Sequence, residues 1–276
     1  MSRVRGLVLA CHPLPTLAVT VMAGFLAAAV GLPVGTVLLV VGAVLTGQLS
    51  IGWHNDLLDG ERDRLARRTD KPVATGGVDV RTIRVATAAA LVLTIVLSVL
   101  LGFPAGAAAL LIVVCGWGYN LGLRATALSF VPYVIAFGVL PAVPTLALPD
   151  APWPFWWAMT AGAALGVAAH LLNVLPDLDD DLRNGIRGLP HRIGVRGSVA
   201  AAMLLVLVAA AALLFGPAGP VSWWRWAAFG VLVVAGVWVL ARSAATPGRA
   251  LFRVLAASAA LDVLLLAVSG TTIVRG

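Results

Sequence analysis

Residues 55–72, NDLLDGERDRLARRTDKP, form a polar segment that follows a long apolar run. Asp56, Asp59 and Asp63 stand in it at positions i, i+3 and i+7. At roughly 100° per residue, this spacing places three carboxylates within an arc of about 60° on one helix face. Like charges on one face repel each other, and a bound divalent cation removes that repulsion. Oxygen ligands with room left for phosphate oxygens are typical of Mg²⁺, so the segment predicts a magnesium site.

A second polar segment lies at residues 173–194, NVLPDLDDDLRNGIRGLPHRIG. Asp177 and Asp181 are four residues apart and therefore share a helix face. Asp179 and Asp180 lie off that face, and for them a solvated loop charge and support of a metal are both open. A single acidic pair would indicate a solvated loop. Two acidic segments, each following an apolar run and each followed by arginines, favour a shared metal site.

The composition indicates a membrane protein. Of 276 residues, 61% are hydrophobic and 11% are charged, and the mean hydropathy is +1.00. Soluble domains carry roughly 25% charged residues, so this chain has too little polar surface for a water-soluble body. Its two isolated cysteines form no disulfide framework. Its four histidines show no HExxH-type spacing.

The apolar segments predict an all-α polytopic bundle of nine transmembrane helices, which form a single domain over residues 1–276. A spanning helix needs about 20 mostly apolar residues. The expected spans are about 8–31, 34–54, 81–102, 105–121, 126–147, 153–175, 197–215, 223–241 and 250–270. The first is expected to be a retained helix, because its apolar run is too long for a signal peptide and contains two prolines.

The charges predict the topology of this bundle. With the N-terminus inside, 17 of 19 basic and ten of 12 acidic residues fall on one face. The exceptions are Arg225, Arg275, Asp150 and Asp262. The positive-inside rule makes that face cytoplasmic, so we expect a multi-pass protein of the cytoplasmic membrane with its motif loops, 55–80 and 177–196, inside. The net charge of +7 therefore reports topology, and no nucleic-acid partner is expected.

Two acidic residues suggest an internal repeat. Asp56 and Asp177 each stand at the end of an expected span, and four spans separate them. This spacing predicts two four-helix repeats plus a ninth helix, with a shared site at the interface of the repeats. Asp262 lies inside the ninth span. An intramembrane carboxylate is a functional hint, but the sequence shows no partner for it.

The polar segments together predict binding of a diphosphate. Two or three Mg²⁺ ions and nearby basic side chains fit an anion of that charge, and an apolar bundle suits a long hydrocarbon tail. Metals draw charge off a departing diphosphate, and aromatic faces stabilise the allylic cation that remains. The basic candidates are Arg64, Arg67, Arg68, Lys71, Arg124, Arg187 and Arg192. The aromatic candidates, each also compatible with ordinary helix packing, are Trp53, Trp117, Tyr119 and Tyr133.

These residues resemble a known family. NDLLDGERD followed by RRTDKPVATG resembles the NDxxDxxxD…KP segment of the UbiA-type intramembrane prenyltransferases. DLDDDLRNGIRGLPHRIG looks like the second acidic motif of that family, and YNLGLR at 119–124 is similar to its Tyr-x₄-Lys segment between helices four and five. The resemblance covers most of the chain.

The resemblance implies a role for individual positions. Mg²⁺ would be coordinated by Asp56, Asp59, Asp63, Asp177 and Asp181. The diphosphate would be bound by Asn55, Arg67, Arg68, Lys71 and Arg187. Tyr119, Arg124 and Asn173 would act in catalysis, and Asn173 would also support the metals or the diphosphate. Arg124 stands where the family usually has lysine, which keeps the charge but changes the geometry and leaves a proton-relay role open. Residues 187–190, RGLP, also depart from the family pattern, which is consistent with a different acceptor.

Three functions follow from this interpretation. The first is prenyl transfer from a polyprenyl diphosphate to a lipophilic acceptor such as an aromatic ring or hydroxyl. The second is cyclisation to a terpene without an acceptor, which the scarcity of polar groups at the inner helix ends favours. These polar groups are His12, Thr16, Gln48, His54, His170 and Asn173. Transfer is expected because transferases dominate the family. Transport is a distant third, because the carboxylates stand at helix ends and not at the midplane.

Overall fold

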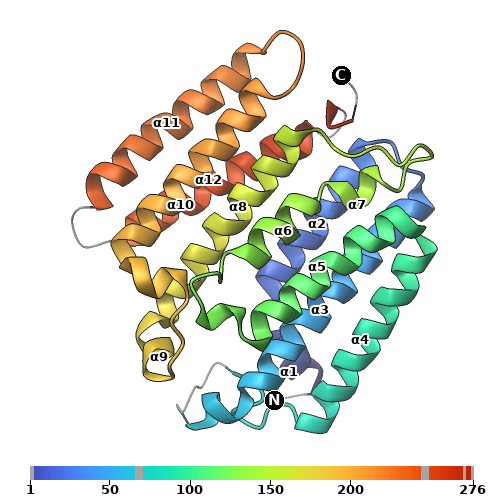
Figure 1. The fold of residues 1–276 in the computed structure, drawn as a ribbon, viewed down its shortest axis with the longest axis vertical. Helices are drawn as coiled ribbons and strands as arrows, with labels where there is room; N and C mark the ends of the chain where they lie inside the picture. Colours follow the sequence, from blue (N-terminus) through green and yellow to red (C-terminus); the bar gives the residue numbers. More distant parts are fainter. Residues whose placement is uncertain (1–2, 66–70, 244–248, 270–271, 275–276) are drawn as a thin grey trace.

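The computed structural model describes residues 3–65, 71–243, 249–269 and 272–274, and in these ranges the chain is helical with no strand (Figure 1). The α-helices are α1 (Arg3–Ala10), α2 (Pro13–Ala29), α3 (Val34–Leu65), α4 (Val80–Leu100), α5 (Phe103–Leu121), α6 (Val131–Val139), α7 (Ala142–Thr145), α8 (Trp156–Val174), α9 (Leu178–Arg183), α10 (Leu189–Phe215), α11 (Trp223–Ser243) and α12 (Arg249–Val268). Two 3₁₀ helices, η1 (Leu123–Ala125) and η2 (Leu175–Asp177), precede α6 and α9.

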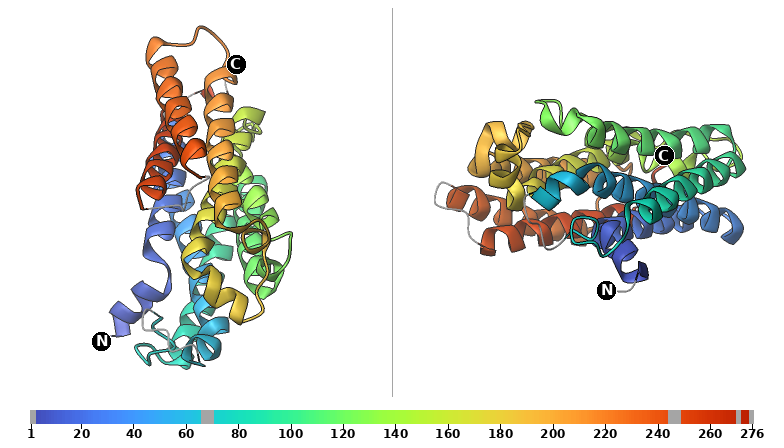
Figure 2. Two further views of the ribbon diagram at one scale, coloured as in Figure 1. Left: turned by 90° about the vertical axis from the view of Figure 1, so that its left-hand side faces the viewer. Right: turned by 90° about the horizontal axis from the view of Figure 1, so that it is seen from below.

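The long helices run side by side in an elongated bundle (Figures 1 and 2). In the first half of the chain, α3 packs against α2, α4 and α5, and in the second half, α8 packs against α10 and α12. α8 also packs along α6, which joins the two halves. Large side chains such as Leu26, Trp157, Leu171 and Met203 are fully buried in the core between these helices.

The helices confirm a multi-pass membrane protein. Within the described ranges, six helices are long and apolar enough to cross a membrane: α3, α4, α5, α8 together with α9, α10 and α11. The bent pair of α1 and α2 would make a seventh. The expected count of nine spans and the arrangement in two repeats therefore stay predictions.

The prediction of one continuous first helix over 8–31 was wrong. The chain forms α1 and α2, which meet at a bend of 72°. Pro13 begins α2, and a residue before proline is sterically disfavoured in the α region. His12 lies outside that region and adopts a left-handed conformation with φ 54° and ψ 71°. The hydroxyl of Thr16 donates to the Cys11 carbonyl oxygen over 2.8 Å, which caps the break.

Two other expected boundaries also differ. The second span was expected to end at residue 54, but α3 continues to Leu65, so the first acidic motif is helical and not a loop. The fifth span was expected over 126–147, but only Val131–Thr145 forms a short apolar helix. Pro132 and Pro141 account for this difference, because proline starts a helix readily and interrupts one that is under way.

The break between α1 and α2 is held against α3 by a close backbone contact at Gly52. A Cβ atom at Gly52 would lie 2.7 Å from the carbonyl oxygen of Cys11 and 2.8 Å from its carbonyl carbon. The indole nitrogen of Trp53 also donates to the Leu7 carbonyl oxygen over 2.8 Å. A side chain at position 52 would therefore separate α1 from α3.

We expect Gly52→Ala to lower the melting temperature of the detergent-solubilised protein, because forcing a methyl group into a filled contact costs about 1–3 kcal/mol. The matched control is Gly35→Ala, since a Cβ atom there meets nothing within 4 Å. That control should melt at or slightly above the wild-type temperature, because alanine is the better helix former. Equal melting temperatures for the two variants would contradict the close contact.

Candidate active site

The three aspartates of the first acidic motif form a buried face of α3. Asp56, Asp59 and Asp63 are 1%, 4% and 4% exposed, although the helix itself carries exposed charged residues on its other faces. The i, i+3, i+7 spacing therefore had the predicted effect of placing these carboxylates on one side. Buried carboxylates require ionic or hydrogen-bonding partners, because removal of a charge from water is costly.

Cationic side chains from three segments meet these carboxylates. The Arg124 guanidinium of η1 binds Asp59 with two hydrogen bonds, of 2.6 and 2.5 Å. Arg62 Nη2 lies 3.0 Å from Asp59 and 3.7 Å from Asp63. Lys71 Nζ lies 3.5 Å from Asp56 Oδ1, and the Val73 backbone N–H donates to Asp56 Oδ2 over 3.4 Å. These partners offset part of the cost of burying the carboxylates on this face of α3.

The pairing with Asp59 also keeps Arg124 charged. Burial alone would lower the pKa of the Arg124 guanidinium, but the hydrogen bonds and charge of Asp59 raise that pKa above its ordinary value. Such a two-point arrangement matches the planar fork of a guanidinium to a carboxylate. The same fork can bind phosphate oxygens.

The second acidic motif lies at the same end of the bundle, on η2 and α9 (Figure 1). Asp181 interacts electrostatically with Arg62 and Arg124, the two arginines that bind Asp59. Asp181 Oδ2 also lies 3.4 Å from His191 Nε2 on α10. His12 at the α1–α2 break interacts with both Asp59 and Asp177. The two acidic motifs thus converge on one set of basic residues.

The carboxylates themselves are not gathered into a ready metal cage. In the described part of the chain, no three His, Cys, Asp or Glu side chains are close enough to hold one ion. Arg124 and Arg62 contact Asp59, and Lys71 contacts Asp56. These basic side chains balance the carboxylate charges that bound metal ions would otherwise balance.

The other predicted residues are distributed around this cluster. Lys71 lies 3.5 Å from His12 Nε2 as well as near Asp56. Asn55 Nδ2 donates to Asn120 Oδ1 over 3.3 Å. Asn173 and Arg187 lie on either side of α9 and are exposed, so the structure does not bring them into the buried cluster. Arg67 and Arg68 lie outside the described residues.

Beneath the cluster, aromatic rings from three helices are in contact. Tyr119 of α5 packs edge-to-face on Tyr133 of α6, with ring centroids 5.2 Å apart. His170 of α8 stacks on Tyr133 at 4.6 Å and meets Tyr119 at 5.6 Å. Tyr119 also interacts electrostatically with Arg124 and Asp181, which places these rings next to the charged layer.

The other two aromatic candidates have packing roles. Trp117 stacks on His54 with ring centroids 4.0 Å apart, and Trp53 binds the α1 backbone. Arg62 and His191 were not predicted as site residues, and His170 was predicted only as a polar group at an inner helix end. For Arg62, the i+3 spacing from Asp59 was an available signal. His170 and His191 reach the site through tertiary packing, which no local sequence pattern indicates.

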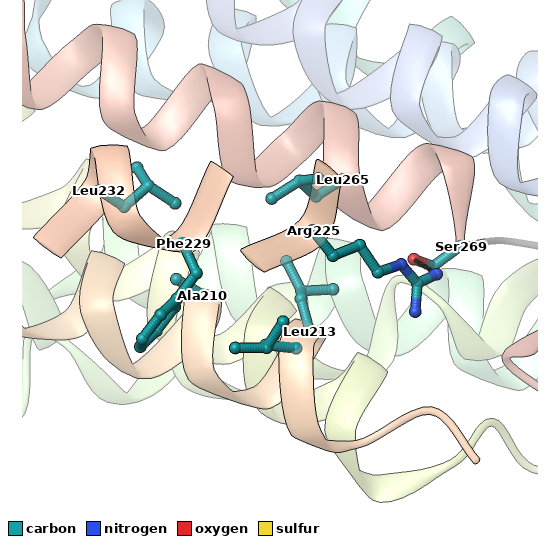
Figure 3. Close-up of a pocket in the computed structure, with 8 residues that line it drawn as sticks. Ala210, Leu213, Arg225, Phe229, Leu232, Leu265 and Ser269 are labelled. Atoms are coloured by element: carbon teal, nitrogen blue, oxygen red, sulfur yellow. Dashed lines mark hydrogen bonds between the residues drawn. The ribbon is translucent and has the colours of Figure 1, made fainter. Parts of the chain in front are cut away.

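A second, separate pocket lies at the opposite end of the bundle between α10, α11 and α12 (Figure 3). Its walls are Ala210, Leu213, Leu214, Arg225, Phe229, Leu232, Leu265 and Ser269. Arg225 donates to Ser269 Oγ over 3.1 Å and lies over the Trp224 ring at 5.4 Å. Among the residues that the structure describes, no acidic one lines this pocket, which therefore differs in chemistry from the carboxylate cluster.

Several solved structures share this fold. A UbiA homologue from Archaeoglobus fulgidus bound to GPP and Mg²⁺ matches with a TM-score of 0.72 and 12% identity, over 98% of this chain and 100% of that one. The apo UbiA homologue from Aeropyrum pernix K1 matches with a TM-score of 0.66 and 19% identity, over 94% and 96%. A digeranylgeranylglyceryl phosphate synthase matches with a TM-score of 0.68 and 15% identity, over 98% and 99%. At these identities, the likeness shows a shared fold.

The sequence comparisons give the family. No curated protein matched the chain. Residues 17–270 match the UbiA prenyltransferase family, and this range includes both acidic motifs and the Tyr119–Arg124 segment. The chain therefore belongs to the UbiA prenyltransferase family.

Proposed function

We propose that this protein is a Mg²⁺-dependent intramembrane prenyltransferase, which ionises a polyprenyl diphosphate and transfers the prenyl group to a lipophilic acceptor. The observation that carries the proposal is the buried carboxylate face of α3, opposed by arginines that also reach Asp181. The family membership supports it, as do the A. fulgidus homologues of the same fold, which were solved with GPP and Mg²⁺ and with DMAPP and Mg²⁺.

The donor set fits magnesium. The proposed ligands, Asp56, Asp59, Asp63, Asp177 and Asp181, offer only the hard oxygen atoms that Mg²⁺ prefers. Asp56 Oδ1 is buried and accepts no hydrogen bond within the described residues, although the Lys71 ammonium is 3.5 Å away. An oxygen in this state can accept a metal without losing a hydrogen bond. Bound Mg²⁺ would supply Lewis-acid stabilisation of the leaving diphosphate.

The basic residues would bind the diphosphate. Arg124 and Lys71 now neutralise Asp59 and Asp56, and both side chains keep donors that suit phosphate oxygens. We assign Asn55, Arg67, Arg68 and Arg187 to the same anion. Arg124 would hold the diphosphate by charge, because a guanidinium does not lose its proton at working pH.

The aromatic layer would receive the reacting end of the prenyl chain. Tyr119 and Tyr133 present ring faces and edges directly beneath the charged residues. Ring faces stabilise an allylic cation by cation–π attraction, and a closely packed layer excludes water that would quench it. The charge distribution of the chain supports a cytoplasmic orientation of this end in the cytoplasmic membrane. Asn173 would contact substrate from the α8 end.

Removal of a proposed metal ligand should abolish turnover. We expect Asp56→Asn and Asp177→Asn to lower kcat by at least about 100-fold, because each removes charge that would hold the metal and stabilise the leaving group. The assay is Mg²⁺-dependent consumption of geranylgeranyl diphosphate by purified protein, with a membrane lipid extract as the source of the acceptor. The matched control is Asp180→Asn, since Asp180 pairs with the exposed Arg183 at 3.1 Å. Full activity in both ligand variants would refute the site.

Arg124 and a metal should compete for Asp59. We expect Arg124→Met to lower the melting temperature of the protein in EDTA. Removing one partner of a buried ion pair costs about 3–5 kcal/mol. The cost here should be smaller, because Arg62 still contacts Asp59. Added MgCl₂ should then raise the melting temperature of Arg124→Met more than that of the wild type, since the metal supplies the missing charge. Arg183→Met, which breaks an exposed pair, should respond to MgCl₂ as the wild type does. An identical response in all three proteins would exclude metal binding at Asp59.

Cyclisation is the second candidate, and the apolar bundle around the contacting rings of Tyr119 and Tyr133 favours it. Incubation with Mg²⁺ and farnesyl or geranylgeranyl diphosphate alone separates the two functions. A transferase should form prenyl alcohol only slowly, because water is the only nucleophile present. A cyclic hydrocarbon detected by gas chromatography and mass spectrometry would overturn the proposal of obligate transfer.

A further inference from the structure

His170 is a buried histidine in the aromatic layer, and the proposed reaction gives it no role. It is 1% exposed and stands on α8, seven residues before Asp177. Its ring stacks on Tyr133 and meets the edge of Tyr119. From the sequence alone, it was predicted only as one of the few polar groups at the inner helix ends.

Ser129 fixes one side of the His170 ring. Ser129 is 0% exposed, and its Oγ lies 3.0 Å from His170 Nε2. The Leu189 backbone N–H at the start of α10 donates to the same Oγ over 2.9 Å. Gly188 permits this contact, because a Cβ atom there would lie 2.5 Å from the Arg124 carbonyl oxygen and 3.0 Å from Ser129 Oγ.

These contacts determine the tautomer of His170. The Ser129 hydroxyl accepts from Leu189, and among the described residues its own hydrogen has one acceptor within reach, His170 Nε2. If Nε2 instead carried the proton, both the Ser129 hydrogen and the Nδ1 lone pair would be left without partners. The arrangement therefore favours the neutral ring with its proton on Nδ1.

The Nδ1–H group is then a buried donor that nothing satisfies. Within the described part of the chain, His170 Nδ1 has no hydrogen-bond partner. A buried donor without a hydrogen bond costs about 1–3 kcal/mol of stability, and native proteins seldom contain one. The proposed function puts the acceptor at this aromatic layer, where an oxygen atom of a ligand would complete the bond.

We propose that His170 Nδ1–H donates a hydrogen bond to an oxygen atom of the acceptor, and so selects a lipophilic hydroxyl compound such as a phenol. This inference rests on the proposed function and names the chemistry of its second substrate. His170 positions the acceptor through a fixed donor and does not act as a base, because Ser129 occupies its only lone pair.

The position of His170 favours the acceptor over the diphosphate. The diphosphate ligands are the charged residues Arg124 and Lys71, which contact the α3 carboxylates. His170 contacts Tyr119 and Tyr133 instead, and of these Tyr119 is the residue that interacts with Arg124. A neutral donor among rings suits the oxygen of an aromatic or hydroxyl compound. It is a poor match for a multiply charged anion.

The test uses two probes of the same shape, 1-naphthol and naphthalene, with the full chain in nanodiscs and ¹⁵N-labelled histidine. We expect the His170 resonances of the free protein to be those of the Nδ1–H tautomer, and 1-naphthol, but not naphthalene, to shift the Nδ1 resonance. The hydroxyl should improve binding about fivefold, the ratio that one net hydrogen bond of roughly 1 kcal/mol supplies. Comparison among variants cancels the different partitioning of the probes into the bilayer.

Three variants separate a recognition role from a structural one. His170→Phe keeps a stacked ring and should lose the preference for 1-naphthol. His170→Asn keeps an N–H group near the position of Nδ1 and should retain most of that preference. The matched control is His54→Phe, since His54 is also buried and stacked, on Trp117, but lies outside the contacts of His170. This control should keep the full preference.

Several outcomes would overturn the inference. These are a dominant Nε2–H tautomer, a preference for 1-naphthol that survives in His170→Phe, or an Nδ1–H resonance that 1-naphthol leaves unchanged, as a trapped water would produce. The test is independent of turnover. If Asp56→Asn and Asp177→Asn stayed active while the 1-naphthol response of His170 held, the proposed metal site would fail and the phenol site would stand.

Discussion

The structure depends on the ion pair between Arg124 and Asp59. The pair is partly buried and bidentate, and it joins the acidic end of α3 to the segment between α5 and α6. A carboxylate row buried on one helix face would be unstable alone, because desolvated like charges repel each other. Arg124, with Arg62 and Lys71, offsets that repulsion, and with His191 and Arg62 it also attracts Asp181 of the second motif. Through this one guanidinium, helices distant in the sequence enclose a single charged site.

The charged layer and the aromatic layer divide the proposed chemistry between them. In the charged layer, the carboxylates and basic residues would hold the diphosphate, the group whose charge changes most during ionisation. Beneath, Tyr119, Tyr133 and His170 form a neutral surface in contact through their rings. Tyr119 interacts electrostatically with Arg124 and packs on Tyr133, so it stands at the boundary between the two layers. A substrate with a charged head and an apolar tail would fit across this boundary without leaving the bilayer.

Much of this was predictable from local periodicity, and the remainder depended on tertiary packing. The spacing of Asp56, Asp59 and Asp63 predicted their common buried face, and the apolar segments predicted a polytopic helical bundle. The break at His12 followed from Pro13, but the long apolar run concealed it. The contact of Ser129 with His170 joins residues 41 apart in the sequence, so no helical spacing could show it. Arg62 stands three residues after Asp59, so its pairing with Asp59 was predictable from the sequence, but Arg62 was not assigned to the site.

The sharp bend at His12 has a consequence for the depth of the site in the membrane. α1 is turned by 72° from the axis of α2, and it exposes Val4, Val8 and Leu9 along its length. Apolar side chains on such a helix settle at the level of the lipid head groups. Trp53 and Gly52 hold the end of α1 against α3 just before Asp56, so the depth of α1 in the membrane and the depth of the carboxylates are linked. An α1 at the level of the head groups would keep the carboxylates close to the phosphates of membrane-dissolved lipids.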